Sequence, residues 1–193
     1  MQTSNRFAFK EWAAVCRAVA AGRQTVLLRK GGIHERRGRF AVEHDEFWLF
    51  PTRFHQSDEE LSDEGRGFLA EARATEPEAG FVRLSEYVTV ADVLRIEREE
   101  VLPALRSFHV YADRVLSDRF RYKQPGLTLL VVRAFAVATP VTIPDSPHFA
   151  GCRSWVDLPA EIATSGLRPA LDDATFGRLR GEVRSAVETT ATA

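Results

Sequence analysis

The chain has 193 residues, of which 45% are hydrophobic and 27% are charged, and its formal net charge is -1. A chain of this size is typical of one globular domain, which folds without needing disulfides or metals because it buries about 70% of its unfolded surface. The small net charge excludes a uniformly basic nucleic-acid-binding chain, so any contact with nucleic acid would use a local patch.

Neither a run of eighteen apolar residues nor a signal-peptide pattern occurs, so we expect a soluble, cytoplasmic protein without a membrane partner. The two cysteines, Cys16 and Cys152, lie far apart and form no CxxC pair. We expect Cys16 to be a buried free thiol, because it falls on the apolar side of a predicted helix.

The first predicted element is an amphipathic helix over residues 7–21, which Gly22 would terminate. Its apolar positions recur at helical spacing and are Trp12, Val15, Cys16 and Val19. A short run of leucine and β-branched residues then predicts a strand over residues 24–30.

Residues 39–51 read as one or two strands that end at Pro51. We expect the apolar residues at this strand end to be core. The following segment, residues 57–73, is acidic at its start and predicts a helix, with weak positions at Gly65 and Gly67.

Alternating apolar residues predict a strand over residues 81–90, and a charged, helix-prone segment predicts a helix over 91–105. Residues 108–116 fit a strand or a helix equally well. The nearly continuous apolar run at residues 126–137 predicts a central strand of a sheet.

We expect a proline-containing loop over residues 139–148 and a short last strand over 152–159. A final helix is predicted over residues 172–187. Its apolar residues on one side are Phe176, Leu179, Val183 and Val187.

The order of these elements predicts one α+β or α/β domain with a mixed β-sheet flanked by helices. We place this domain at residues 6–160. Residues 161–193 would form a C-terminal helical extension with a frayed end.

Histidines and carboxylates are concentrated in residues 31–56, and together they make a candidate pocket or metal site. The candidate ligands are His34, Glu35, Glu43, His44, Glu46 and His55. Imidazole and carboxylate groups suit a divalent metal such as Mg, Mn or Zn. Their spacing matches no established metal motif, and a solvated strand face is the alternative.

Two basic segments are candidates for contact with phosphate or nucleic acid. The first surrounds a Gly31-Gly32 turn, and the second alternates cations with aromatic residues near position 120, a pattern suited to backbone contact and base stacking. The candidate residues are Arg29, Lys30, Arg36, Arg37, Arg39, Arg53, Arg119, Arg121 and Lys123. A strand with solvated charges on one side is the alternative for the second segment.

Several separate blocks, among them "FKEWAAVCRAVAAGRQTVLLRKGGIHE", "EFWLFPTRFHQ" and "GCRSWVDL", resemble the bacterial family known as domain of unknown function 1802. The resemblance implies an accessory or binding module in a DNA-related system, for restriction-modification or defence. Its partners would be DNA or a restriction-type protein. The family's activity is unassigned, so the resemblance transfers no catalytic residue.

The predicted strand order is also similar to that of a Nudix hydrolase. This likeness implies, as the alternative function, a metal-dependent hydrolase of a nucleotide or another phosphorylated compound. The acidic segment nevertheless lacks the REUxEE pattern that binds magnesium in that fold, and the chain has no PD-(D/E)-x-K nuclease motif. Whether the protein is an enzyme stays open at this point.

Overall fold

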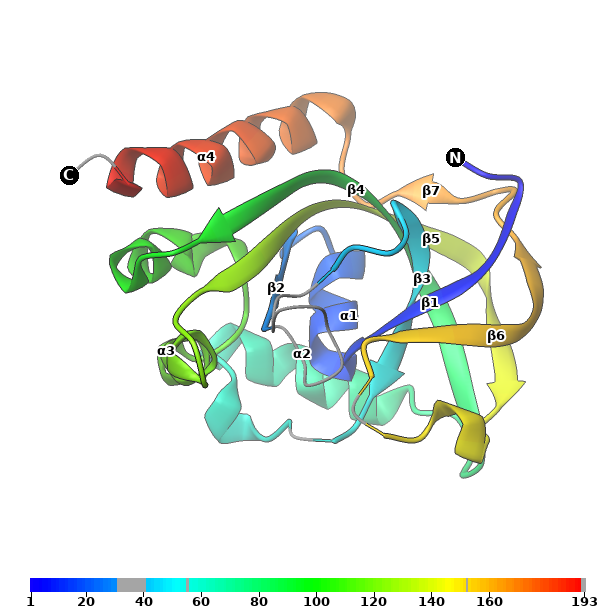
Figure 1. The fold of residues 1–193 in the computed structure, drawn as a ribbon. Coiled ribbons are helices and arrows are strands. Elements are labelled where there is room, and N and C mark those ends of the chain that lie inside the picture. The colour runs from blue at the N-terminus through cyan, green and yellow to red at the C-terminus, as the bar shows by residue number, and fades with distance from the viewer. Residues whose placement is uncertain (31–40, 55, 152, 192–193) are drawn as a thin grey trace.

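A mixed β-sheet organises the structure, a computed structural model that describes residues 1–30, 41–54, 56–151 and 153–191 (Figure 1). The strands are β1 (Ser4–Trp12), β2 (Val26–Arg29), β3 (Glu46–Thr52), β4 (Phe81–Ile96), β5 (Leu127–Pro144), β6 (Trp155–Ala163) and β7 (Arg168–Pro169). Within the described residues the sheet has the order β2-β5-β4-β3-β1-β6, with β7 paired to β5. The pair β1–β3 is parallel and the other pairs are antiparallel. The prediction of a single α+β domain with a mixed sheet is confirmed.

Helices cover one face of this sheet. The α-helices are α1 (Ala13–Ala20), α2 (Asp63–Ala74), α3 (Asp113–Arg121) and α4 (Asp173–Ala191), and the 3-10 helices are η2 (Asp58–Glu60), η3 (Glu99–Phe108) and η4 (Pro147–Phe149). In Figure 1, α4 runs along β4, whereas α1 and α2 lie below it and α3 lies to the left. The larger hydrophobic core fills the space between the α-helices, η3 and the sheet, whereas Phe149 of η4 packs on the opposite face.

A second, smaller core lies on the opposite face of the sheet. Alternation along β3 separates the two cores, because successive side chains of a strand point to opposite faces. Phe47 and Leu49 belong to the larger core, and Trp48 and Phe50 belong to the smaller one. The prediction that the end of this strand is core is therefore confirmed, and both of its faces are buried.

The predicted helix over residues 7–21 is wrong in its first half. Residues up to Trp12 form β1, and the helix begins only at Ala13. β1 pairs with β3 on one side and with β6 on the other, so its backbone hydrogen bonds are made within the sheet. This tertiary pairing outweighs the helical spacing of the apolar residues.

The predictions between residues 91 and 126 also need correction. β4 continues to Ile96, and η3 follows it, so the predicted helix over 91–105 is wrong in its first part. The second basic segment lies at the end of helix α3 and in the turn that follows, and it is not a strand. Phe120 is accordingly buried while its neighbour Arg121 is exposed, as expected for the two sides of a helix.

The predicted loop at residues 139–148 is instead largely strand, because β5 runs through Pro140 to Pro144 and pairs there with β4. Gly65, predicted as a weak position, lies inside a continuous α2. A Cβ atom at Gly65 would lie 2.5 Å from the backbone oxygen of Val110, so the glycine allows the close approach of these two segments.

The last helix matches its predicted position. Phe176 and Val183 of α4 are buried in the larger core, and Leu179 and Val187 pack against it. Arg180 adds an ion pair of 2.6 Å to Asp92 of β4. No helix in the described part of the chain is long and apolar enough to cross a membrane.

Candidate functional site

The described members of the candidate metal site have other partners. The His44 ring stacks on Phe7, with ring centroids 3.6 Å apart. The Glu46 carboxylate accepts a hydrogen bond of 2.9 Å from the Tyr87 hydroxyl and two from the backbone N–H of Gln2. Glu43 is exposed. Among the described residues, no group of three or more His, Cys, Asp or Glu is arranged to hold a metal ion.

Several candidate residues lie outside the part of the chain that the structure describes. These residues are His34, Glu35, Arg36, Arg37, Arg39 and His55. The metal-site prediction therefore stays untested for its three undescribed members.

The structure brings the two basic segments of the sequence together. The Lys30 ammonium donates hydrogen bonds of 2.9 Å to the backbone oxygens of Phe120 and Gly126, and it also contacts the oxygen of Gln124. Burial, with a smaller contribution from the nearby charge of Arg95, lowers the Lys30 pKa. Lys30 thus fixes the end of β2 against the turn after α3, although about 90 residues separate them in sequence.

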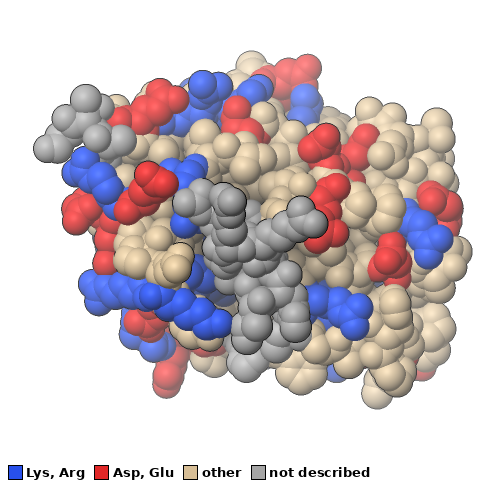
Figure 2. Space-filling model, viewed as in Figure 1, with Lys and Arg blue, Asp and Glu red and all other residues tan. Residues whose placement is uncertain are grey.

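We call the surface formed by Arg29, Lys30, Arg119, Arg121, Tyr122 and Lys123 the two-segment surface. Tyr122 is 55% exposed, and the Lys123 ammonium lies 5.2 Å from the centroid of its ring. Figure 2 shows Lys and Arg side chains gathered at the lower left, where Figure 1 places α3. An exposed aromatic ring beside cations is a suitable platform for a planar, anionic ligand.

Two candidate arginines have carboxylate partners on the surface. Arg121 pairs with Glu99 at 2.8 Å, and this contact raises the pKa of Arg121 and lowers that of Glu99. Arg53 pairs with Glu76, and both side chains are more than one-third exposed. Exposed ion pairs contribute only about 0–1 kcal/mol, so a phosphate can replace the carboxylate at little cost.

A buried polar group, which we call the Glu11 cluster, adjoins the two-segment surface and shares Arg29 and Arg119 with it. Its members are Glu11, Trp12, Arg29, Tyr111 and Arg119. Glu11 is the residue before the last of β1, and its Oε1 accepts a hydrogen bond of 2.8 Å from the N–H of Trp12, which precedes α1. Its Oε2 lies 3.4 Å from Arg29 Nη2, and the Glu11 side chain is only 1% exposed.

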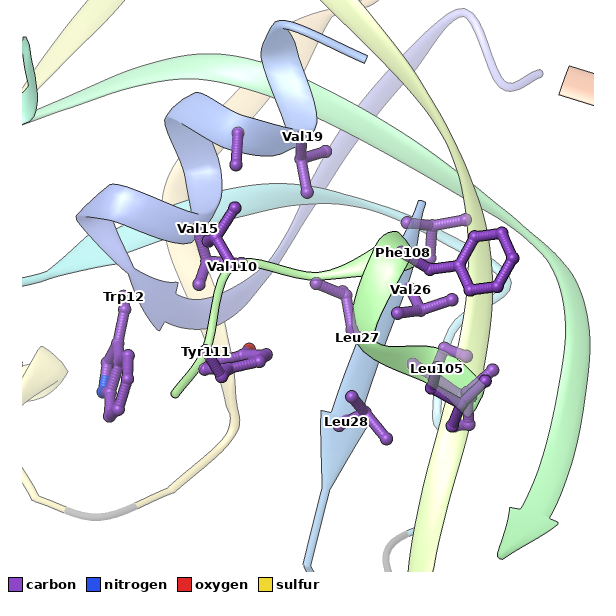
Figure 3. Close-up of a cluster of buried hydrophobic side chains, with 14 of the residues drawn as sticks. Trp12, Val15, Val19, Val26, Leu27, Leu28, Leu105, Phe108, Val110 and Tyr111 are labelled. Carbon is purple, nitrogen blue, oxygen red and sulfur yellow. The ribbon is translucent and has the colours of Figure 1, made fainter. Parts of the chain in front are cut away.

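Aromatic rings and guanidinium groups alternate in the Glu11 cluster. Arg119 lies over Trp12 at 4.5 Å and over Tyr111 at 4.7 Å, measured to the ring centroids. The two rings meet edge to face at 5.4 Å, and Figure 3 shows them beside each other at one end of the larger core. Arg29 similarly lies 4.2 Å from the Phe9 ring centroid.

Three buried atoms of the Glu11 cluster make no hydrogen bond of ordinary geometry within the described residues. These atoms are Glu11 Oε2, Arg29 Nε and the Tyr111 hydroxyl oxygen. Burial and the charge of Glu11 raise the Tyr111 pKa, so this hydroxyl remains protonated and able to donate. Two of these atoms nevertheless have a charged neighbour, since Glu11 Oε2 faces Arg29 Nη2 at 3.4 Å and the Tyr111 hydroxyl contacts Arg119.

The sequence analysis selected Arg29 and Arg119 but missed Glu11, Trp12 and Tyr111. A usable signal was present at residues 7–11, where Phe7, Phe9 and Glu11 alternate with their neighbours as in a strand. A carboxylate at the end of such an apolar alternation indicates a buried charge in need of a partner.

Comparisons with solved structures found weak likenesses. The ASCH protein of Zymomonas mobilis has a TM-score of 0.45 and 11% identity, with 91% of this chain and 93% of that chain covered. A ZmASCH mutant protein from the same organism has a TM-score of 0.46 and 10% identity, with 94% and 98% covered. At this level of similarity, neither comparison informs the function of this chain.

No curated protein matches the chain. The comparisons give no support to a Nudix hydrolase or to a restriction system. A family model, described as "Domain of unknown function (DUF1802)", matches residues 8–182, which run from within β1 to within α4. Because this match spans nearly the whole sequence, the chain belongs to the DUF1802 family.

Proposed function

We propose that this protein is a binding module for nucleic acid, which it contacts through the two-segment surface. The observation that carries the proposal is the junction made by Lys30. Two basic segments that are distant in sequence meet there, with Tyr122 and Lys123 exposed beside them.

The chemistry of the two-segment surface favours a single strand. Stacking of a base on Tyr122 requires a base whose face is free, and in a duplex both faces of a base are covered by its neighbours. Lys123 lies against the same ring and can contact the adjoining phosphate. Lys123 also has a φ of 58°, which costs a non-glycine residue about 1–2 kcal/mol, so the position of this side chain is maintained against strain.

Arg121 supplies a second cation that can contact phosphate. Its partner Glu99 is on η3, and the Arg121 side chain is 69% exposed. Lys30 has a different role, because its three backbone acceptors occupy its donors and it holds the surface together.

Fluorescence anisotropy with labelled 12-nucleotide single-stranded DNA and RNA, measured over a series of salt concentrations, tests the proposal. Lys123→Ala should reduce the slope of log K against log salt by about 0.7, the value for one lost phosphate contact on a single strand. Tyr122→Ala should cost about 1–3 kcal/mol of binding free energy and leave the slope unchanged, because stacking releases no counterions.

Arg178→Ala is the matched control. Arg178 is an exposed arginine of α4 that pairs with Glu182, one turn further along the same helix. This variant loses one positive charge away from the two-segment surface, and its affinity should equal that of the wild type. Equal weakening in Arg178→Ala and Lys123→Ala, or no binding at low salt, would contradict the proposal.

A further inference from the structure

A groove lies between η3 and α3, next to the two-segment surface. It encloses about 400 Å³, which is within the range of sites that hold small organic ligands. In Figure 1, η3 is the green coil that follows β4, and α3 lies below it. The apolar residues of the groove are Leu102 and Pro103 of η3 and Leu116 of α3. Such a lining can bury the face of a planar ring without leaving polar groups unpaired.

Two ion pairs join the helices at the groove. Arg106 of η3 donates to Asp113 of α3 at 3.0 Å, and Glu99 of η3 pairs with Arg121 of α3 at 2.8 Å. All four side chains line the groove, and those of Arg106, Asp113 and Arg121 are more than half exposed. Exposed ion pairs contribute little to stability, so a ligand can replace one partner of such a pair at little cost.

The charged groups of the groove match the two ends of a nucleotide. A phosphate accepts hydrogen bonds from a guanidinium such as that of Arg121, and the N–H groups on the edge of a base can donate to a carboxylate. Glu100 and Asp113 supply such carboxylates. A small polyanion such as diphosphate fits less well, because together with Glu99 three carboxylates line the groove against two guanidinium groups.

The groove and the two-segment surface share Arg121, and Tyr122 follows it directly in the chain. We therefore propose that the groove holds one nucleotide of the bound strand, the neighbour of the nucleotide that stacks on Tyr122. Its base lies against Leu102 and Leu116, and its phosphate takes the place of Glu99 on Arg121. This inference rests on the proposed function, since the two-segment surface holds the rest of the strand.

Filling the groove tests the proposal by the same anisotropy measurement. Ser117 of α3 lines the groove and is half-buried, so Ser117→Phe places a ring in the space that the base would occupy. This variant should bind a 12-nucleotide deoxyadenosine homopolymer about tenfold more weakly, the equivalent of one lost base contact. Its affinity for an abasic strand of the same length should fall by less than about threefold, because that strand has no base to exclude.

Ala104→Phe is the matched control. Ala104 is an exposed residue of η3 that does not line the groove, so this variant adds the same ring outside the site. Its affinity for both strands should equal that of the wild type.

Glu99→Gln is the second variant. The amide keeps the size of the side chain and removes its charge, so a phosphate no longer competes with a carboxylate for Arg121. The affinity for the homopolymer should rise about two- to fivefold, the equivalent of one exposed ion pair. Glu182→Gln removes an equal charge on α4 and should leave the affinity unchanged. A thermal melt shows whether each variant is folded. If Ser117→Phe does not fold, Glu99→Gln carries the test.

The outcomes separate this inference from the proposed function. Salt-dependent binding that is equally tight in wild type and Ser117→Phe would overturn the groove site and leave the binding module intact. Equal weakening in Ser117→Phe and Ala104→Phe would also overturn it, because the loss would then come from bulk outside the groove. An affinity of Glu99→Gln no higher than that of Glu182→Gln would show that no phosphate replaces Glu99. Absence of all binding would overturn both proposals.

Discussion

The two faces of the sheet both bury polar side chains, but they differ in how completely these side chains are hydrogen bonded. In the smaller core, Trp48 Nε1 donates to the Asn5 backbone oxygen at 3.1 Å, and Asn5 Nδ2 donates to the Tyr87 hydroxyl at 2.9 Å. The Tyr87 hydroxyl in turn donates to Glu46 at 2.9 Å. On the helix-covered face, three polar atoms of the Glu11 cluster make no hydrogen bond of ordinary geometry within the described residues, although Glu11 Oε2 lies 3.4 Å from Arg29 Nη2. The two faces therefore differ in how well the geometry satisfies their buried polar groups.

The largest expected effect on stability comes from Trp48, which lies in the smaller core. This side chain is fully buried, so Trp48→Ala should lower the free energy of unfolding by about 3–5 kcal/mol through lost transfer energy and a cavity. Chemical denaturation measures this loss. Tyr122→Ala removes an exposed aromatic ring and serves as the control, with an expected change within about 0.5 kcal/mol. A Trp48→Ala loss below about 1 kcal/mol would contradict the assignment of this indole to the core.

The second effect concerns His109, a buried titratable group. Neither ring nitrogen makes a hydrogen bond of ordinary geometry within the described residues, and burial lowers the His109 pKa to about 4. The unfolded chain, with a pKa near 6.5, therefore binds more protons than the folded chain between pH 4 and 6.5. The contribution of neutral His109 to the free energy of unfolding is fully present above pH 6.5. It falls by about 3 kcal/mol as the pH drops to 4.

The His109 effect must be measured as a difference between wild type and His109→Phe. Burial raises the pKa of Glu86 to about 7, against the opposing charge of Arg17, so stability from Glu86 is lost as the pH rises from about 4.5 to 7. The two groups thus act in opposite directions over a shared pH range. The wild type should lose stability relative to His109→Phe as the pH falls, and a constant difference would show that His109 does not titrate as described.

A smaller effect on stability is expected from the Tyr87 hydroxyl, which links Asn5 to Glu46. Tyr87→Phe should lower the free energy of unfolding by about 1–2 kcal/mol, because it removes one hydrogen-bond partner each from Asn5 and Glu46. Denaturant unfolding of Tyr87→Phe beside the wild type gives this value directly. A variant as stable as the wild type would show that the network contributes nothing net.

The matched substitution on the other face should have the smallest effect. Tyr111→Phe removes a buried hydroxyl whose contact with Arg119 falls short of ordinary hydrogen-bond geometry, so the free energy of unfolding should fall by less than in Tyr87→Phe. Equal losses in Tyr87→Phe and Tyr111→Phe would remove the distinction between the two faces. Both variants keep the ring, so a difference between them reports on the hydroxyl groups.

The strands with strong local signals were predictable from the sequence. The apolar run at residues 126–137 lies within β5, and the strand end at Pro51 lies within β3. The secondary-structure predictions were wrong where pairing between distant segments of the chain determines the conformation. Residues 7–12 carry helical spacing, yet they form β1 because β3 and β6 supply partners on both sides.

The site was predictable only in part, for the same reason. Arg29 and Arg119 were selected for their charge, but nothing local indicates that they meet. Their proximity depends on the pairing of β2 with β5 and on the position of α3. Glu11 and Tyr111 lie in segments whose secondary structure was predicted incorrectly or left open, and a buried carboxylate is recognised only when its surroundings are known.

The position of β1 in the sheet also determines when the protein can finish folding. β1 lies between β3 and β6, and Asn5 pairs with Ile162, so this strand waits for a segment that is synthesised more than about 150 residues later. At ribosomal rates the interval is on the order of ten seconds, during which one edge of β1 is unpaired. Such long-range pairing slows folding, because the entropy of closing the loop is lost before the contacts form. During this interval the nascent chain exposes an unpaired strand edge, which is a site where another chain can pair.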